Sequence, residues 1–468
     1  MAIQLSKKDV FWGYFAEFFS LASGLITLPL ILKLLTSDEI GVNYIMLTIG
    51  SIVSLFDFGF GTQFGRNVTY VFSGVESLEK DKVGLINNDR NINYKLLVTL
   101  IKTAKFVYKR ISIIVLLFML SFGTYYMSII TDNFNAVDNS LSIWLIYSCS
   151  TFFNIYYTYY LSLLIGKGLI QESRKAMILS KSTSVLLTFI LLYCGFGLLA
   201  VAISNFIAPF VSRYYSYKVF FTSDVKIQMA SHKIDKSEIK ELFQVIWYNA
   251  RKLGLIMVAA SSLTYLTMFI VSCFLSLADV ASYGLMIQLT GIICVVSMSL
   301  FNSMLPNISY LYVNNEVERF KNKLAISLFV FYILFIVGSF VLIYVVPFML
   351  EIIDSKTILP PTIVLLVFVI FNFFEKNQSL FSQILLLENK VPFMNAAILT
   401  GIIATLAVLI SLYLNFGIIG VVIAQSIPTL LYSAWKWPLV VFKKFNLSFY
   451  TDVLERGFVQ IKKINKNA

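Results

Sequence analysis

Residues 55–66 read LFDFGFGTQFGR and join an apolar segment to a charged one. Asp57 lies inside the apolar run, although an ionised side chain at the centre of a membrane helix costs about 2.5–3.5 kcal/mol on insertion scales. Such a side chain is expected to face the protein interior, a partner or water. Gly61 and Gly65 place a smooth stripe beside the carboxylate, so another helix or a lipid headgroup can approach it closely.

The composition is typical of a polytopic membrane protein. The chain has 468 residues, of which 58% are hydrophobic and 13% charged, whereas soluble domains carry about 25% charged residues. The net charge of +12 lies mainly in loops between apolar segments, so we expect it to set topology rather than to bind nucleic acid. The four cysteines show no metal-ligand spacing, and the single histidine, His232, lies in a polar loop. No catalytic residue, metal site or cofactor is predicted, and the chain is not expected to be an enzyme.

Twelve apolar segments have the length of about 20 residues that crosses a bilayer as a helix. A spanning segment must satisfy its own backbone hydrogen bonds, so an all-α polytopic membrane protein with twelve transmembrane helices is predicted. The predicted spans are residues 11–33, 41–63, 111–130, 141–165, 176–194, 197–220, 246–274, 282–310, 326–350, 360–386, 392–413 and 417–440.

Basic residues concentrate in alternate connections between these spans. Residues 66–110 and 213–240 carry nine and six lysines or arginines, whereas the connection 131–140, TDNFNAVDNS, carries none. By the positive-inside rule, the basic connections and both termini are predicted to be cytoplasmic.

The two halves of the chain resemble each other. Residues 35–46, LTSDEIGVNYIM, match 275–286, LSLADVASYGLM, and residues 196–207, FGLLAVAISNFI, match 416–427, FGIIGVVIAQSI. Two repeats of six spans insert with the same orientation and enclose a cleft, which is an alternating-access architecture. The predicted parts are an N-terminal six-helix bundle (1–220), a cytoplasmic linker (221–245), a C-terminal six-helix bundle (246–440) and a cytoplasmic basic tail near anionic lipid (441–468).

Few charged side chains are predicted within the spans, and those identified fall in the cytoplasmic half of the bilayer. They come from both repeats, so they can converge at the mouth of the cleft, where a charge costs less than against lipid. Structural roles remain open: snorkelling to the interface, pairing with a neighbouring helix, or capping a helix end. The set is Glu17, Asp57, Arg251, Lys252, Glu375 and Lys376.

Aromatic residues in FFNIYYTYY (152–160) recur at helical spacing. Phe152, Tyr156, Tyr159 and Tyr160 fall on one face, which suits contact with sugar C–H groups or packing against other spans. Asn249, a polar group in a span, can donate to sugar hydroxyls or bond to another helix.

The chain resembles the Wzx-type O-antigen and polysaccharide flippases of the multidrug/oligosaccharidyl-lipid/polysaccharide (MOP) exporter superfamily. The likeness rests on residues 12–46, on LFDFGFGTQFGR, on the AxYGLMIQLTG pattern of residues 281–291, and on the six-plus-six layout. It implies a MATE-like fold in the bacterial inner membrane. The implied function is translocation of an undecaprenyl-pyrophosphate-linked oligosaccharide from the cytoplasmic to the outer face, for O-antigen or lipopolysaccharide biosynthesis. H+ or Na+ coupling and a polysaccharide polymerase and chain-length proteins as partners are implied as well.

By motif position, this resemblance assigns Asp57 and Arg66 to the site, whereas Arg251 and Lys252 match only in type and region. A pyrophosphate headgroup requires cations, and arginine can contact it with two hydrogen bonds. The expected substrate-binding residues are Arg66, Arg251, Lys252, Lys376, Tyr156, Tyr160 and Asn249. The expected ion-coupling residues are Glu17, Asp57 and Glu375.

Three other functions compete. A MATE-type cation-coupled multidrug exporter predicts an anionic cavity, whereas the charges here are of both signs. A major-facilitator transporter predicts GxxxDRxGRR between spans 2 and 3, which DFGFGTQFGR does not match. A membrane-embedded glycosyltransferase or polymerase predicts a large outer loop, and none longer than about ten residues is expected.

Overall fold

The computed structural model describes residues 7–80, 92–388 and 392–467. Every regular element of these residues is a helix, which confirms the predicted fold class. The chain divides into two compact units, Met1–Tyr265 and Leu266–Ala468. The boundary lies inside a helix, whereas the sequence suggests a linker at 221–245, and that assignment stays a prediction.

The first unit contains ten α-helices, counted over the described residues, and the last of them runs into the second unit. Long spans are broken by short 3-10 or π turns. The elements are α1 (Lys7–Leu34), α2 (Ser37–Ser54), η1 (Leu55–Asp57), α3 (Phe60–Phe72), α4 (Tyr94–Phe118), η2 (Met119–Gly123), α5 (Thr124–Ile130), α6 (Ser140–Gly166), α7 (Ile170–Tyr193), α8 (Leu198–Phe220), α9 (Ser223–Ser231) and α10 (Lys236–Phe274).

The second unit is likewise built from long helices that short 3-10 or π turns interrupt. Its elements are α11 (Leu277–Val313), α12 (Val317–Phe340), η3 (Val341–Val345), α13 (Val346–Ile352), α14 (Thr362–Leu385), η4 (Leu386–Glu388), α15 (Met394–Tyr413), α16 (Gly417–Pro428), η5 (Thr429–Ser433), α17 (Ala434–Lys444), η6 (Phe449–Glu455) and α18 (Arg456–Asn467).

All twelve predicted spans fall on helices. Ten helices or helix runs of the described residues are long and apolar enough to cross a membrane. The long helices α6 and α10 coincide with the other two predicted spans. The count of twelve is therefore consistent with the structure, while the predicted orientation of the termini stays a prediction.

Matching local conformations accompany the internal repeat. Thr36 caps α2 by accepting a hydrogen bond from the backbone N–H of Glu39 at 3.2 Å, and Ser276 caps α11 by accepting one from Asp279 at 3.2 Å. In addition, a π turn of five residues interrupts the third predicted span of each half, at η2 and at η3. These agreements go beyond shared hydrophobicity, because caps and π turns depend on local backbone geometry.

The turns before α8 and α16 share a second feature. Gly195 and Asn415 adopt positive φ angles of 83° and 59°, and Gly197 and Gly417 adopt 54° and 58°. A left-handed residue ends the preceding helix, and glycine or asparagine accepts that conformation at low cost. The equal spacing explains why FG recurs at these two places in the sequence.

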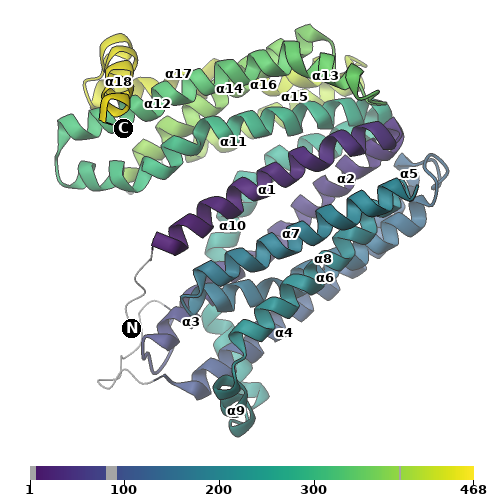
Figure 1. The fold of residues 1–468 in the computed structure, drawn as a ribbon, viewed down its shortest axis with the longest axis vertical. Helices are drawn as coiled ribbons and strands as arrows, with labels where there is room; N and C mark the ends of the chain where they lie inside the picture. Colours follow the sequence, from purple (N-terminus) through teal and green to yellow (C-terminus); the bar gives the residue numbers. More distant parts are fainter. Residues whose placement is uncertain (1–6, 81–91, 389–391, 468) are drawn as a thin grey trace. The chain divides into compact units, whose positions relative to one another are not determined.

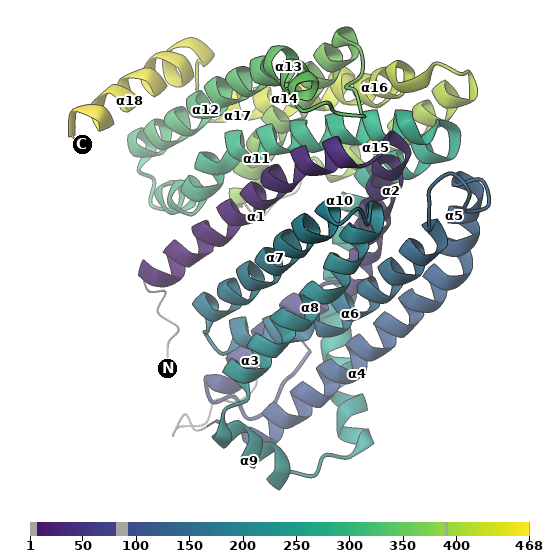
Figure 2. The same cartoon turned by 45° about the vertical axis from the view of Figure 1, so that its right-hand side comes forward.

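In the first unit, α1, α7, α8, α6 and α4 lie side by side in that order (Figure 1), and a view turned by 45° shows the same order (Figure 2). The hydrophobic core lies mainly between α3, α4 and α6, around fully buried Phe64, Tyr108 and Leu163. This packing leaves a polar space between α6, α7, α8, α1 and the α2–α3 break.

Candidate functional site

A cavity of about 680 Å³ lies within the first unit and is the candidate site. Helices α1, α2, α4, α6, α7 and α8 line it together with the α2–α3 break. Most of the polar lining side chains come from α6, α7 and α8. Half of the lining residues carry a hydroxyl or amide group: Ser20, Ser54, Tyr108, Tyr147, Ser150, Thr151, Asn154, Tyr157, Thr158, Ser180, Ser184, Asn205 and Ser212. Asp57 and Lys181 are the charged residues among the lining residues that the structure describes.

Pro209 explains part of the polar wall. A proline within a helix has no N–H to donate to the carbonyl four residues earlier, which is that of Asn205. The hydroxyl of Ser150 on α6 donates to this carbonyl at 2.8 Å, and Ser184 on α7 donates to the Asn205 side chain at 3.2 Å. Backbone groups at membrane depth require such partners, so the three helices are joined by hydrogen bonds beside the cavity.

Asp57 owes its position to a break in the helix. The 3-10 turn η1 ends at Asp57, and the next two residues, Phe58 and Gly59, have positive φ angles of 45° and 73°. Left-handed backbone is unusual for phenylalanine. Gly254 of α10 leaves room for it, because a Cβ atom there would lie 2.6–2.9 Å from Phe58.

Two donors hold the Asp57 carboxylate. Tyr108 of α4 donates its phenol proton to Oδ1 at 2.5 Å, and the backbone N–H of Gly61 donates to Oδ2 at 3.2 Å. Hydrogen bonds to the charged form stabilise a carboxylate away from bulk water. From the sequence, Asp57 could either cap a helix end or take part in ion coupling. In the structure it caps the start of α3 and also lies in the cavity wall.

The glycine stripe beside Asp57 packs against a helix. Thr69 of α3 donates to the carbonyl of Gly166 on α6 at 3.0 Å, and a Cβ on Gly166 would lie 2.4 Å from the Gly65 carbonyl oxygen. The sequence allowed either a helix or a lipid headgroup to approach these glycines. At Gly65 the structure places a helix, α6.

Lys181 is the functional candidate that the sequence reasoning missed. It lies on α7 inside the predicted span 176–194, flanked by Ser180 and Ser182, and its side chain is accessible from the cavity. The run of small polar residues around a lysine, SKSTS, was the available signal. The average hydropathy of an apolar span conceals a single charge of this kind.

Other predicted residues of the first unit lie outside the cavity lining. Arg66 is exposed on α3 and donates to the Gln63 side chain. Glu17 is exposed on α1, next to the lining residue Ala16. Their assignments to substrate binding and ion coupling stay predictions.

The aromatic face of α6 is mostly core. Tyr160 is 6% exposed and stacks on Tyr159, with ring centroids 4.4 Å apart, and Tyr156 is half-buried against the same cluster. The residue that reaches the cavity is Tyr157, which the sequence did not single out. The helix turns by about 100° per residue, so the face that meets the cavity depends on rotation about the helix axis.

The predicted residues of α10 occupy separate positions. The amide of Asn249 donates to the backbone carbonyl of Lys80 at 2.9 Å, and the exposed Arg251 lies 5.3 Å from the ring centroid of Tyr248. The side chain of Lys252 lies outside the described residues.

In the second unit, Lys376 and Glu375 pair with each other. The Nζ–Oε1 distance is 3.0 Å, although neighbouring helical residues point about 100° apart. Both side chains are about one-third exposed, so the pair is an internally neutralised polar site on α14. The predicted meeting of this pair with Asp57 in a common cleft stays a prediction.

No protein-family model matches the sequence, and no curated protein matches it. Several solved structures share its fold. One is an inward-facing multidrug resistance MATE family transporter of the MOP superfamily, with a TM-score of 0.60, 13% identity, and coverage of 92% of this chain and 95% of the other. Another is the lipid II flippase MurJ in an inward closed conformation, with a TM-score of 0.58, 16% identity, and coverage of 97% and 91%. An outward-facing MATE transporter has a TM-score of 0.53, 13% identity, and coverage of 94% of both chains.

The chain therefore has the fold of MOP-superfamily membrane transporters and is a multi-pass membrane protein. The likeness extends over nearly the full length of each chain, and it concerns the fold alone at these identities. Both an exporter and a lipid flippase are built on this fold, so the substrate must be argued from the site.

Proposed function

We propose that the protein is a flippase for an undecaprenyl-pyrophosphate-linked oligosaccharide, an O-antigen or similar repeat unit. It moves this lipid from the cytoplasmic to the outer face of the bacterial inner membrane by alternating access. The observation that carries the proposal is the composition of the first unit's cavity, in which a lysine accompanies a dense set of hydroxyl and amide groups.

These groups suit a glycan. Sugar hydroxyls donate and accept hydrogen bonds, and so do the serine, threonine, asparagine and tyrosine side chains of the lining. Tyr147 and Tyr157 also offer aromatic faces, which stack on sugar C–H surfaces. The polyprenyl chain needs no enclosed site, because it stays in lipid while the headgroup crosses.

The charges suit an anionic headgroup with a coupled cation. Lys181 offers an ammonium group to pyrophosphate, and Arg66, Arg251, Lys252 and Lys376 are further candidate cations for its loading. Asp57 offers a carboxylate for H+ or Na+, with Glu17 and Glu375 as further candidates for coupling. A polysaccharide polymerase and chain-length proteins would use the lipid once it reaches the outer face.

A multidrug exporter is the second candidate. The observation in its favour is the Asp57 carboxylate in the cavity wall, which can attract an organic cation. The MATE transporter with a TM-score of 0.60 shows that the fold serves this function in another protein. Lys181 opposes this alternative, because it repels a cation in the same cavity.

Reconstituted vesicles separate the two functions. Purified protein is placed in vesicles that contain a fluorescent polyprenyl-pyrophosphate oligosaccharide, and flipping is followed as loss of protection from a membrane-impermeant quencher. Vesicles without protein are the control. Uptake of a fluorescent organic cation is measured in parallel on vesicles that contain the protein. Flipping without cation uptake supports the flippase, whereas cation uptake without flipping overturns it in favour of the exporter.

A further inference from the structure

Lys181 has no counter-ion in the part of the chain that the structure describes. No hydrogen bond and no ion pair joins it to another described residue. Lys175, six residues earlier on α7, is different: its Nζ lies 2.8 Å from Glu172 and 5.4 Å from the ring centroid of Trp12. One helix thus carries a paired lysine near its start and an unpaired one in the cavity.

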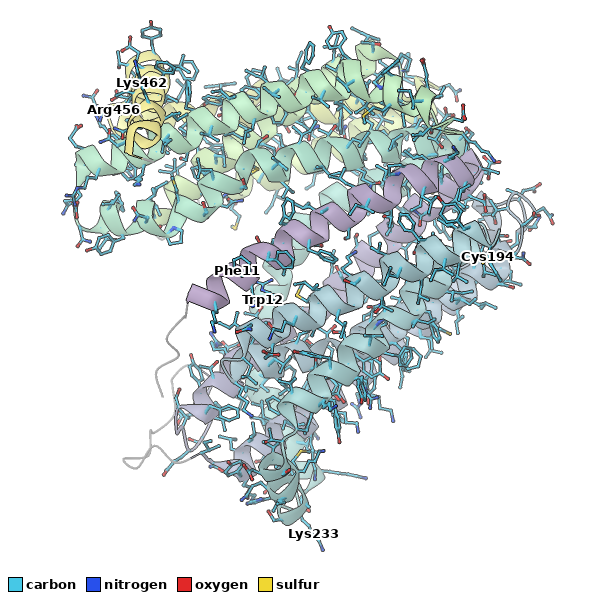
Figure 3. The ribbon with its side chains drawn as sticks, in the orientation of Figure 1. Phe11, Trp12, Cys194, Lys233, Arg456 and Lys462 are labelled. Atoms are coloured by element: carbon cyan, nitrogen blue, oxygen red, sulfur yellow. The ribbon has the colours of Figure 1, made fainter. Side chains whose placement is uncertain are left out.

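The position of Lys181 along α7 is central. At about 1.5 Å per residue, it lies about 17 Å from Ile170 and about 18 Å from Tyr193. Figure 3 labels Cys194, which follows the last residue of α7, and Trp12 of α1, whose ring contacts Lys175 near the beginning of α7. A charge against lipid is most costly at this depth, and the exposed side chain of Lys181 avoids this cost because it lines the cavity, where water or a ligand can reach it.

The carboxylate in the same cavity does not neutralise Lys181, because no ion pair joins Asp57 to it among the described residues. Both oxygens of Asp57 already accept hydrogen bonds, from Tyr108 and from Gly61. Asp57 also lies at the end of its candidate span, Ser37–Asp57, and not at the middle. The ammonium group of Lys181 is therefore available to an anion that enters the cavity.

We propose that Lys181 is the residue that holds the phosphate-type anion of the substrate halfway across the membrane, as distinct from the residues that load it at the surface. This inference rests on the proposed flippase function and deepens it. An anion that crosses the bilayer meets its largest electrostatic cost at the midplane. An ammonium group at that depth lowers this cost when the anion occupies the cavity, so it acts on the rate of crossing as well as on binding of the anion in the cavity.

Asp57 sets the strength of this interaction. It is the negative charge among the lining residues described, and it weakens the attraction of the cavity for an anion. The remaining titratable lining groups are the phenols of Tyr108, Tyr147 and Tyr157. Removing the charge of Lys181 and removing that of Asp57 should therefore have opposite effects on anion binding.

The first test measures flipping in the vesicle assay with polyprenyl-pyrophosphate oligosaccharide. Lys181→Met should lower the flipping rate at least tenfold at saturating substrate, because one charge-assisted contact is lost. Lys175→Met on the same helix is the matched control and should keep the wild-type rate. Equal rates for the two variants would overturn the inference, while a wild-type protein that flips nothing would overturn the proposed function instead.

The second test does not depend on flipping. Binding of inorganic pyrophosphate to the detergent-solubilised full chain is measured by titration calorimetry for the wild type, Lys181→Met and Asp57→Asn. Lys181→Met should bind at least tenfold more weakly, and Asp57→Asn about threefold to tenfold more tightly. Misfolding cannot strengthen binding, so tighter binding by Asp57→Asn supports the assignment. Weaker binding by an Asp57→Asn protein whose thermal unfolding matches the wild type overturns it.

The source of the anion is decided by comparing the two ligands. If polyprenyl pyrophosphate competes with inorganic pyrophosphate and Lys181→Met weakens both, the site receives the lipid headgroup. If Lys181→Met weakens inorganic pyrophosphate alone, the site takes a free anion, and the crossing role is overturned.

Discussion

Tyr108 donates a hydrogen bond to Oδ1 of Asp57 at 2.5 Å, although 51 residues separate them in the sequence. Tyr108 is fully buried, and it borders the cavity together with Asp57, which lies at the break between α2 and α3. The phenol therefore fixes the orientation of the carboxylate that the cavity presents, and it connects the α2–α3 break to α4.

Tyr108→Phe should destabilise the protein by about 1.5–3 kcal/mol, because a hydrogen bond to a charged acceptor is lost within the core. Thermal unfolding in detergent measures the effect, and transport should fall as well, since the carboxylate loses its fixed orientation. Tyr193→Phe, at an exposed tyrosine on α7, is the control and should change neither quantity. Equal stability of the two variants would contradict the role given to this hydrogen bond.

Gly166→Ala should be destabilising by about 1–3 kcal/mol. An alanine Cβ would lie 2.4 Å from the Gly65 carbonyl oxygen, and backbone atoms cannot yield as a flexible side chain can. Gly24→Ala on α1 is the matched control, because nothing lies within 4 Å of the new atom. Alanine also favours the helix by roughly 1 kcal/mol, so this control should be neutral or slightly stabilising. Thermal unfolding of both variants gives the comparison, and an unaffected Gly166→Ala would show that α3 and α6 are less closely packed.

Glu39→Ala should cost about 1–2 kcal/mol, because Glu39 serves two helix starts. Its carboxylate accepts from the N–H of Thr36 at 2.8 Å and from the N–H of Leu198, at the start of α8, at 2.9 Å. Asp279→Ala removes only the local cap contact with Ser276 and should cost less. Chemical or thermal unfolding ranks the two variants, and the reverse order would exclude the link from Glu39 to α8 as a stabilising contact.

Ser150→Ala should cost about 1–2 kcal/mol, because it leaves the Asn205 carbonyl without its donor. In a Pro209→Ala background the new backbone N–H can bond to this carbonyl, so the same substitution should cost less. A double-mutant cycle from unfolding midpoints measures the coupling between the two sites. Additive effects would indicate that Ser150 does not compensate for the proline.

Much of the fold follows from local sequence. The helices of the twelve predicted spans could be located because the length of an apolar run can be read along the chain. The repeats could be recognised because LTSDE and FG also encode helix caps and turns. The site was harder to predict. Asp57 stood out as a charge in an apolar run, whereas Lys181 lies among small polar residues and was concealed in the average hydropathy of its span. Tyr157, which the sequence did not single out, lines the cavity next to the predicted Tyr156.

By itself, the sequence determined that the chain is a helical membrane protein of two similar halves, because spanning helices satisfy their backbone within each segment. Only the tertiary structure decided which polar groups meet. The contact of Asp57 with Tyr108 and the shared cavity of Asp57 with Lys181 depend on helix rotation and packing between distant segments. Those quantities arise from side-chain fit across helices, which no stretch of sequence encodes locally.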